Sequence, residues 1–187
     1  MQAKDVMTSP AVTVRPDTSC REAAQLLAER GISALPVVDG GGRPVGIVSE
    51  GDLLPLETRP EPGTPPRPSP ERVQEVMSAE VPAVEHDAGI PLVAQLMLQL
   101  VVRRLPVLED GRVVGVVSRS DLVRLLARPD EELEQRVREV VAGEGVVPSG
   151  VRVREGVVEL SGADGATLRR AEQLAREEPG VFDVRVR

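Results

Sequence analysis

One pattern of apolar and polar positions occurs twice along the chain. Residues 35–54 read LPVVDGGGRPVGIVSEGDLL, and residues 105–123 repeat them as LPVLEDGRVVGVVSRSDLV, one residue shorter in the turn. The earlier parts also recur, because KDVM at 4–7 returns as QEVM at 74–77 and AAQLL at 23–27 returns as VAQLM at 93–97. Such self-similarity indicates two tandem copies of one structural unit, which we place at residues 2–55 and 72–127.

Each copy predicts the same order of elements. A short extended stretch, AVTV at 11–14 or VPAV at 81–84, is followed by a helix. In the first copy Ser19 and Glu22 have the spacing of a capping box, and Gly31 is placed to end the helix. Two strands joined by a short turn and a last helix complete a β-α-β-β-α unit. One unit buries too little apolar surface to be stable alone, so we expect the two to pack about a pseudo-twofold axis.

The segment between the copies is rich in proline. PLETRPEPGTPPRPSP at 55–70 excludes a helix or a central strand. We therefore predict a linker at residues 56–71 that is either extended and semi-rigid or disordered. PPRP at 65–68 also fits the minimal motif of a ligand for SH3-type partners, which is the alternative role for this segment.

The helix predicted at 90–102, IPLVAQLMLQLVV, is apolar on nearly all sides. Either the core of the chain or an interface with a second copy would bury it, and the sequence leaves both open. The run is too short to span a membrane, which needs about 20 residues. MQAKDVMTSP at 1–10 lacks the apolar core of a signal peptide. We therefore expect a soluble, cytoplasmic protein.

The last third of the chain has a different pattern. An amphipathic helix is predicted at 129–145, two alternating strands within 150–162 with a turn at Glu155–Gly156, a second helix at 164–180 and a last strand at 181–187. The order α-β-β-α-β predicts a separate small domain at 130–187. The expected fold class of the whole chain is therefore α/β (α+β), with two repeats and this third domain.

Composition excludes several functions. Phe182 is the sole aromatic residue, so the chain lacks stacking platforms for single-stranded nucleic acid. The net charge of −7 opposes binding to a phosphate backbone, and no nucleic-acid partner is expected. Cys20, the single cysteine, aligns with apolar positions and is predicted to be buried. His86 stands alone in a predicted surface loop, and neither metal-ligand spacing nor an acid pair near a nucleophile occurs, so we expect no enzyme.

The chemistry of the repeat lies in its turn from strand to helix. Ser49 and Asp52 fit the N-cap and N3 positions, and Ser118 and Asp121 return at the same spacing. A plain capping box, worth about 0.5–2 kcal/mol, explains such a pair by itself. The alternative is a nucleotide site, because a helix N-terminus with a serine hydroxyl suits a phosphate and a carboxylate suits the hydroxyls of a ribose.

The two copies resemble cystathionine-β-synthase (CBS) domains in the tandem arrangement called a Bateman module. VM at the start, LPVVD and LPVLE, and GIVSEGDLL and GVVSRSDLV carry the resemblance. It implies a homodimer and a regulatory adenine nucleotide (AMP, ADP, ATP or a relative), with no obligatory cofactor. The implied ligand contacts are Ser33, Ala34, Ser49 and Asp52 at one cleft, Arg103, Arg104, Ser118 and Asp121 at the other, and Thr13, Val14 and Val84 along the base.

The two clefts are predicted to differ in charge. Arg103, Arg104 and Arg119 accompany the second copy, whereas Glu50 stands beside Ser49 in the first. A di- or triphosphate should therefore prefer the second cleft. The alternative is that these arginines are solvated or pair with Glu109 and Asp110.

The C-terminal segment resembles the BON domain, named for bacterial osmotic-shock and nodulation proteins. GVVELSG at 156–162 and PGVFDVRV at 179–186 carry the resemblance, together with alanines of the second helix. It implies association with a phospholipid surface or a protein partner. Each strand places two arginines on one sheet face, either as a basic patch or as a solvated outer face: Arg152 and Arg154, and Arg185 and Arg187.

Two functions follow from these features. The first is a regulatory nucleotide sensor whose CBS pair controls the C-terminal domain through ligand binding. The second is a non-catalytic dimeric adaptor in which the pair is structural and the C-terminal domain binds lipid or a partner.

Overall fold

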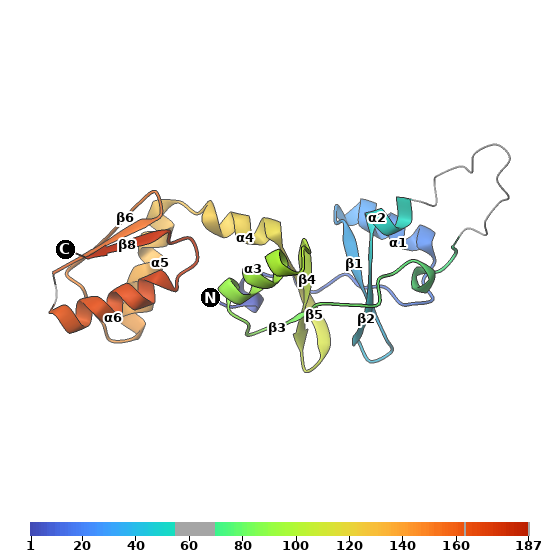
Figure 1. The fold of residues 1–187 in the computed structure, drawn as a ribbon, viewed down its shortest axis with the longest axis horizontal. Helices are drawn as coiled ribbons and strands as arrows, with labels where there is room; N and C mark the ends of the chain where they lie inside the picture. The colour runs from blue at the N-terminus through green and yellow to red at the C-terminus, as the bar shows by residue number, and fades with distance from the viewer. Residues whose placement is uncertain (55–69, 163, 187) are drawn as a thin grey trace. The chain divides into compact units, whose positions relative to one another are not determined.

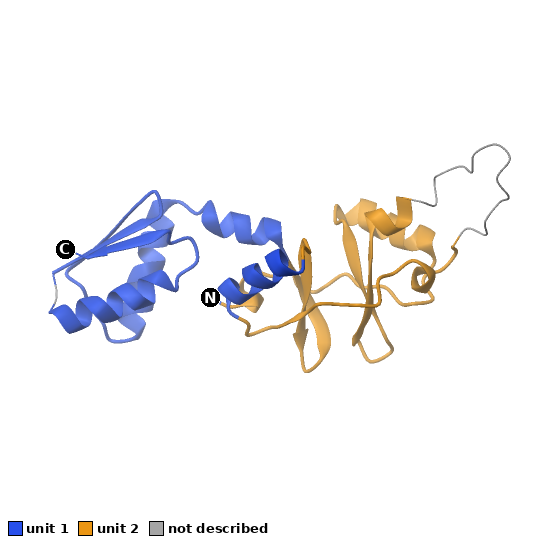
Figure 2. Cartoon of the chain, viewed as in Figure 1, with its two compact units in different colours: residues 1, 89–100, 118–187 blue, residues 2–88, 101–117 orange. Residues whose placement is uncertain are grey.

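The computed structural model describes residues 1–54, 70–162 and 164–186 (Figure 1). Most of the predicted linker at 56–71, with its PPRP motif, lies outside the described residues. The chain forms two compact units (Figure 2): unit 2 is Gln2–Ala88 with Val101–Val117, and unit 1 is Met1 with Gly89–Leu100 and Ser118–Arg187. In the described part of the chain, no helix combines the length and apolar character that crossing a membrane requires.

The first long helix of unit 2, α1 (Cys20–Arg30), begins and ends where the sequence predicts. Ser19 is its N-cap, and the Ser19 hydroxyl accepts a hydrogen bond from the Glu22 backbone N–H at 3.1 Å. Gly31 follows the last residue with a φ of 61°, a left-handed conformation that costs glycine little. Both predicted helix ends are confirmed.

The first sheet of unit 2 has two strands. β1 (Ala34–Val38) pairs antiparallel with β2 (Pro44–Ser49), and the short helix α2 (Glu50–Leu53) starts directly after β2. The strand predicted at 11–14 is reduced to one bridge, between Val14 and Val37. The reason is that this stretch divides its hydrogen bonds, since Val14 N–H donates to Pro36 in β1 whereas Ala11 N–H donates to the Val114 carbonyl.

The core between α1 and this sheet is aliphatic. It includes Cys20, whose side chain is buried as predicted. Burial raises the pKa of the Cys20 thiol, and the negative charge of the nearby Glu75 carboxylate raises it further. The fully buried side chains around it come from α1, both strands and the segment after residue 70: Ala23, Leu35, Val37, Val48 and Val73. The core therefore needs a residue from the second copy, Val73, for completion.

The second sheet has three strands in the order β3-β4-β5. β3 (Val84–Glu85) runs parallel to β4 (Arg104–Glu109), and β5 (Arg112–Ser118) lies on the other side of β4. The β4–β5 turn contains Asp110 and Gly111 at positive φ, 52° and 72°. This tight turn accounts for the residue that the second copy lacks relative to the first.

The Val-Met segment of each copy packs against the other copy within unit 2. The segment of the first copy contains the short helix η1 (Ala3–Asp5), and that of the second contains η3 (Val73–Glu75). Met77 lies against Gly46 of β2, and Met7 lies against Gly115 of β5. Single bridges, Ile47 with Ser78 and Thr8 with Val116, join the same pairs of segments. The two copies thus exchange their first segments.

In unit 1, α3 (Ile90–Gln99) and α4 (Arg119–Leu126) are the helices of the second copy. α3 buries Ile90, Val93 and Met97. Other apolar side chains of α3 remain exposed, among them Leu98, which is 72% exposed. The chain's own core therefore covers only one side of the apolar run predicted at 90–102.

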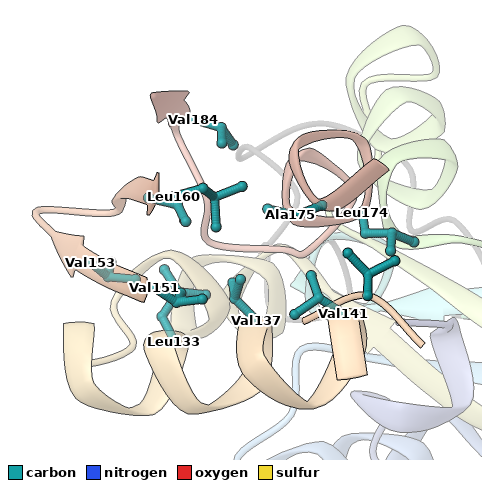
Figure 3. Packing of buried hydrophobic residues seen from close by; sticks show 12 residues of the cluster. Leu133, Val137, Val141, Val151, Val153, Leu160, Leu174, Ala175 and Val184 are labelled. Atoms are coloured by element: carbon teal, nitrogen blue, oxygen red, sulfur yellow. The ribbon is translucent and has the colours of Figure 1, made fainter. Parts of the chain in front are cut away.

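The rest of unit 1 contains a small α/β domain with the predicted order of elements (Figure 1). The elements are α5 (Asp130–Gly143), β6 (Gly150–Arg154), β7 (Val157–Ser161), α6 (Gly165–Arg176) and β8 (Asp183–Val186). β7 is the central strand, antiparallel to β6 and parallel to β8. Figure 3 shows side chains of both helices facing those of the sheet across one aliphatic core, among them Val137, Val141, Leu160 and Ala175.

The hairpin between β6 and β7 turns at the predicted dipeptide. Glu155 and Gly156 have positive φ, 50° and 73°, as a two-residue hairpin turn requires. Both backbone N–H groups donate to the Asp130 carboxylate, at 2.6 and 3.0 Å. The start of α5 therefore holds the turn in place.

Candidate functional site

The two predicted Ser-x-x-Asp turns form capping boxes with matching geometry. Asp52 Oδ2 accepts hydrogen bonds from Ser49 N–H at 2.7 Å and from the Ser49 hydroxyl at 2.6 Å. Asp121 Oδ2 accepts the same pair from Ser118, at 2.8 and 2.6 Å. Each serine hydroxyl therefore uses its single donor within the turn.

The second carboxylate oxygen distinguishes the two copies. Asp121 Oδ1 accepts a hydrogen bond from Arg124 Nη1 at 2.7 Å. Asp52 Oδ1 has no such partner among the described residues, and position 55, the counterpart of 124, is proline. In the described structure, Asp52 thus retains an acceptor that Asp121 has already used.

A cavity of about 480 Å³ lies at the Ser49–Asp52 turn, within unit 2. Pockets of 300–1,000 Å³ are the usual size for small-molecule sites, so this volume accommodates a nucleoside. The structure brings six of the predicted contact residues together around it: Ser33, Ala34, Ser49, Asp52, Arg103 and Arg104.

Arg104 connects the two sides of this cavity. Its Nη2 donates to the Ser33 hydroxyl, which joins β4 to the residue just before β1. Burial lowers the pKa of Arg104, the Glu50 carboxylate opposes that shift, and Arg103 adds to it. Arg104 therefore lies in the electrostatic field of Glu50 rather than in open solvent.

The position of the arginines differs from the predicted grouping. The sequence places Arg103 and Arg104 with Ser118, whereas the structure lines the Asp52 cavity with both. Positive charge is therefore no longer a feature of the second cleft alone. The expectation that a polyphosphate prefers the second cleft loses its main basis.

Three predicted contacts with the base lie elsewhere. Val14 and Val84 are buried in the protein interior. Thr13 lines another cavity of unit 2, of about 520 Å³, together with His86 and Glu109. His86 lies in the turn after β3, in agreement with the predicted loop, and its Nε2 lies 3.9 Å from Glu109 Oε1 at this cavity.

Two carboxylates at the Asp52 cavity were not among the predicted contacts. Glu50 follows Ser49 directly, and Glu80 follows the Val-Met segment of the second copy. The sequence already places Glu50 beside Ser49 at the first cleft, although not as a ligand contact. Glu80 reaches this cavity only because the copies exchange their first segments, which spacing along the chain does not reveal.

No metal site accompanies these residues. Within residues 1–54, 70–162 and 164–186, no group of three or more His, Cys, Asp or Glu side chains could hold a metal ion. The polar side chains that line the Asp52 cavity carry carboxylates, hydroxyls and guanidiniums.

Comparison with known sequences locates the repeats in a family. The sequence model of the CBS domain matches residues 3–57 and 73–128. The CBS domain-containing protein YhcV of Bacillus subtilis is 33% identical over 120 residues, which cover 64% of this chain and 81% of YhcV. By contrast, the chain spans 27%, 22% and 15% of the length of three relatives named as a dehydrogenase, a sulfurtransferase and a tRNA nucleotidyltransferase.

Two solved structures with similar folds contain adenosine-based ligands. The CBS domain pair of protein MJ0100, in complex with 5′-methylthioadenosine and S-adenosyl-L-methionine, is 29% identical with a TM-score of 0.59, covering 68% of this chain and 96% of that one. CBSX2 in complex with AMP is 30% identical with a TM-score of 0.56, covering 66% and 93%. A protein named CBSX2 is known from Arabidopsis thaliana.

Proposed function

The chain belongs to the CBS domain family, and on that premise we propose that it is a regulatory protein that binds an adenosine ligand at the Asp52 cavity. The observation that carries the proposal is the Asp52 carboxylate, which keeps one oxygen without a partner among the described residues on a cavity of nucleoside size. An ionised carboxylate only accepts hydrogen bonds, so the two hydroxyls of a ribose are suitable donors.

The other residues of the cavity complete the assignment. Ser33 and Ala34 border the ligand on the side of β1, and Arg103 and Arg104 border it on the side of β4. Ile47, Pro82 and Val102 supply the apolar surface on which an adenine ring would lie. AMP, methylthioadenosine and S-adenosylmethionine, the ligands named for two similar structures, share this adenosine part.

Calorimetry and thermal unfolding with AMP test the proposal. We expect AMP to stabilise the wild type, by about 2.7 kcal/mol at 100 times its dissociation constant. Asp52→Ala should lose most of this stabilisation. Asp121→Ala is the matched control, because it removes the same capping hydrogen bonds at the other turn. Equal losses in both variants would contradict the assignment of the ribose to Asp52.

The protein acts without catalysis and without an obligatory cofactor in this proposal. Its match to YhcV extends over most of that protein, whereas its matches to the three enzymes cover no more than 27% of their length. The shared part is therefore a module separate from most of each enzyme. The alternative function is a dimeric adaptor with a structural CBS pair, which no response to any adenosine ligand would favour.

The C-terminal domain is proposed to be the controlled part, with a BON-like fold. Its order of elements supports the resemblance, and Arg152, Arg154 and Arg185 alternate with the inward-facing valines of β6 and β8. These three arginines therefore share the outer sheet face, where Glu159 stands between Arg152 and Arg185 in register. Arg187 lies outside the described residues.

Co-sedimentation of the full chain with vesicles distinguishes a lipid surface from a protein partner. The basic face predicts binding to vesicles with anionic lipid that weakens at high salt and in Arg152→Glu/Arg154→Glu. Absence of binding at low salt would favour a protein partner for this domain.

A further inference from the structure

The acidic side chains of the Asp52 cavity bear on the charge of its ligand. Three carboxylates line it, Glu50, Asp52 and Glu80, against two guanidiniums, Arg103 and Arg104. A ligand with several phosphates would therefore bring its negative charges into a site where acids already outnumber bases.

Neither of the usual phosphate-binding devices is available at the turn. α2 is only four residues long, and Glu50 and Asp52 lie in its first turn, where they offset the partial positive charge of the helix end. The Ser49 hydroxyl is used within the capping box. A phosphate would have to compete with bonds that the protein already makes.

Arg104 is also partly committed. It donates to the Ser33 hydroxyl and lies in the field of Glu50, which favours its charged form. Its guanidinium therefore already donates to Ser33 and has a carboxylate in the same cavity before a ligand arrives. Arg103 remains as the second base of the cavity.

The acids at two of these positions are not repeated in the other copy. In the alignment of the two copies, Glu50 corresponds to Arg119 and Glu80 corresponds to Pro10. The charge at the first position is thus reversed between copies, although the Ser-x-x-Asp turn is the same. Glu50 can be changed without altering the shared capping geometry.

We infer that the Asp52 cavity selects adenosine ligands with little negative charge at the 5′ position over di- and triphosphates, and that Glu50 imposes this selection. The accepted class comprises a nucleoside, a monophosphate or a positively charged sulfonium. The inference rests on the proposed function, since it specifies the ligand of the same site.

Titration calorimetry with adenosine, AMP, ADP and ATP tests the inference. The protein is the full chain carrying Asp121→Asn, so that the other turn contributes less to the signal. We expect affinity to fall from AMP to ADP to ATP. Glu50→Gln should raise the ratio of ATP to AMP affinity by about tenfold at low salt, because one negative charge no longer opposes two further ligand charges. The change should shrink at high salt.

Glu29→Gln is the matched control, because Glu29 is an exposed glutamate on α1 outside the cavity lining. It should leave the ratio unchanged. Tight AMP binding with an equally tight ATP complex, unaffected by Glu50→Gln, would overturn the inference and leave the proposed function in place. Failure of the wild type to bind any of the four ligands would overturn both.

Discussion

Asp52 and Asp121 share a backbone role and differ in their neighbours. Each closes a capping box with the serine three residues earlier. Arg124 then pairs with the remaining oxygen of Asp121, whose side chain is only 10% exposed. The repeat has therefore preserved the helix cap in both copies, while one substitution after the cap decides how much of the carboxylate remains for a ligand.

Arg124→Ala should increase the affinity of the Asp121 turn for AMP. The side chain of Arg124 is 78% exposed, and exposed ion pairs of this kind are worth about 0.2–1 kcal/mol. We expect a gain of about 1.4- to fivefold, measured by calorimetry in an Asp52→Ala background. Arg30→Ala, an exposed arginine at the end of α1, is the control. Unchanged or weaker binding in Arg124→Ala would show that the arginine does not compete with the ligand.

Spacing along the chain predicted the local turn of the candidate site, and the family resemblance placed Ser33 and Ala34 beside it, as the structure does. Ser49 and Asp52 are three residues apart, so their spacing along the chain determines that they meet. Thr13 and Arg104 depend on how distant segments pack, and both lie elsewhere than expected. Arg104 stands before a Leu-Pro pair as Ser33 and Ala34 do, but the copies meet so that Arg104 contacts Ser33.

At the scale of elements, the exchange of first segments explains a recurring glycine. Gly46 and Gly115 occupy equivalent positions within β2 and β5, and each faces a methionine of the other copy. A β-carbon there would overlap the methionine sulfur and lie 3.1 Å from a backbone carbonyl oxygen, of Ser78 or Thr8. The sequence contains both halves of this contact, but spacing cannot show whether Met77 packs on its own copy or on the other.

Gly46→Ala and Gly115→Ala should therefore each destabilise the CBS pair. Overpacking in a well-filled interior typically costs about 1–3 kcal/mol. The free energy of unfolding can be measured by urea titration. Gly143→Ala is the control, because its β-carbon would meet nothing within 4 Å at the end of α5. A loss no larger than in the control would mean that the Val-Met segments do not pack tightly on these strands.

Unit 1 contains a buried carboxylate between two arginines. Glu178 is 4% exposed, and its Oε1 lies 3.7 Å from Arg128 Nη1 and 3.5 Å from Arg136 Nε. None of these three atoms has a hydrogen-bond partner in the described structure. Arg128 follows α4, and a β-carbon at Gly180 would lie 2.9 Å from the Leu125 carbonyl. These contacts connect the end of α4 to the C-terminal domain.

Arg128→Met should destabilise this domain strongly. Arg128→Met leaves the buried Glu178 carboxylate with Arg136 as its remaining partner. Complete loss of the partners of a buried charge costs about 3–5 kcal/mol, and we expect a loss of stability up to that size. The double variant Arg128→Met/Glu178→Met should cost less than the sum of the single changes. Arg170→Met is the control, since its pair with Glu144 lies at the surface and is worth about 0–1 kcal/mol. Additive effects in urea unfolding would show that the two side chains do not interact.

At the scale of the whole molecule, periodicity predicted the order of elements. It did not predict how much of the apolar helix at 90–102 the chain itself buries. Alternation and turn chemistry sufficed for the C-terminal α-β-β-α-β order, including the turn at Glu155–Gly156. The run at 90–102 was equally compatible with a core and with an interface. Its packing is decided by what the rest of the chain covers, and Leu92, Leu98 and Leu100 remain exposed.

The exposed apolar residues of unit 1 favour self-association. Val123 and Leu126 on α4 join Leu92 and Leu98 on α3 as large exposed side chains of the second copy, and the two helices contact each other. Large apolar side chains exposed on two contacting helices are candidates for an interaction site. We therefore propose that these two helices form the interface of a homodimer, as the family resemblance implies.

Leu98→Glu tests this interface in the full chain. A charge at the centre of an apolar interface must be desolvated on association, which we expect to raise the dimer dissociation constant at least about tenfold. Light scattering coupled to size-exclusion chromatography at several concentrations would report the change in mass.

Val147→Glu is the matched control, because Val147 is 75% exposed in the C-terminal domain and lies on neither helix. A dimer that persists in Leu98→Glu would place the interface elsewhere. A wild type that is monomeric at high concentration would contradict the proposed homodimer. Because Leu98 is already exposed, the substitution should leave the unfolding transition of the monomer unchanged, and this separates loss of the dimer from loss of the fold.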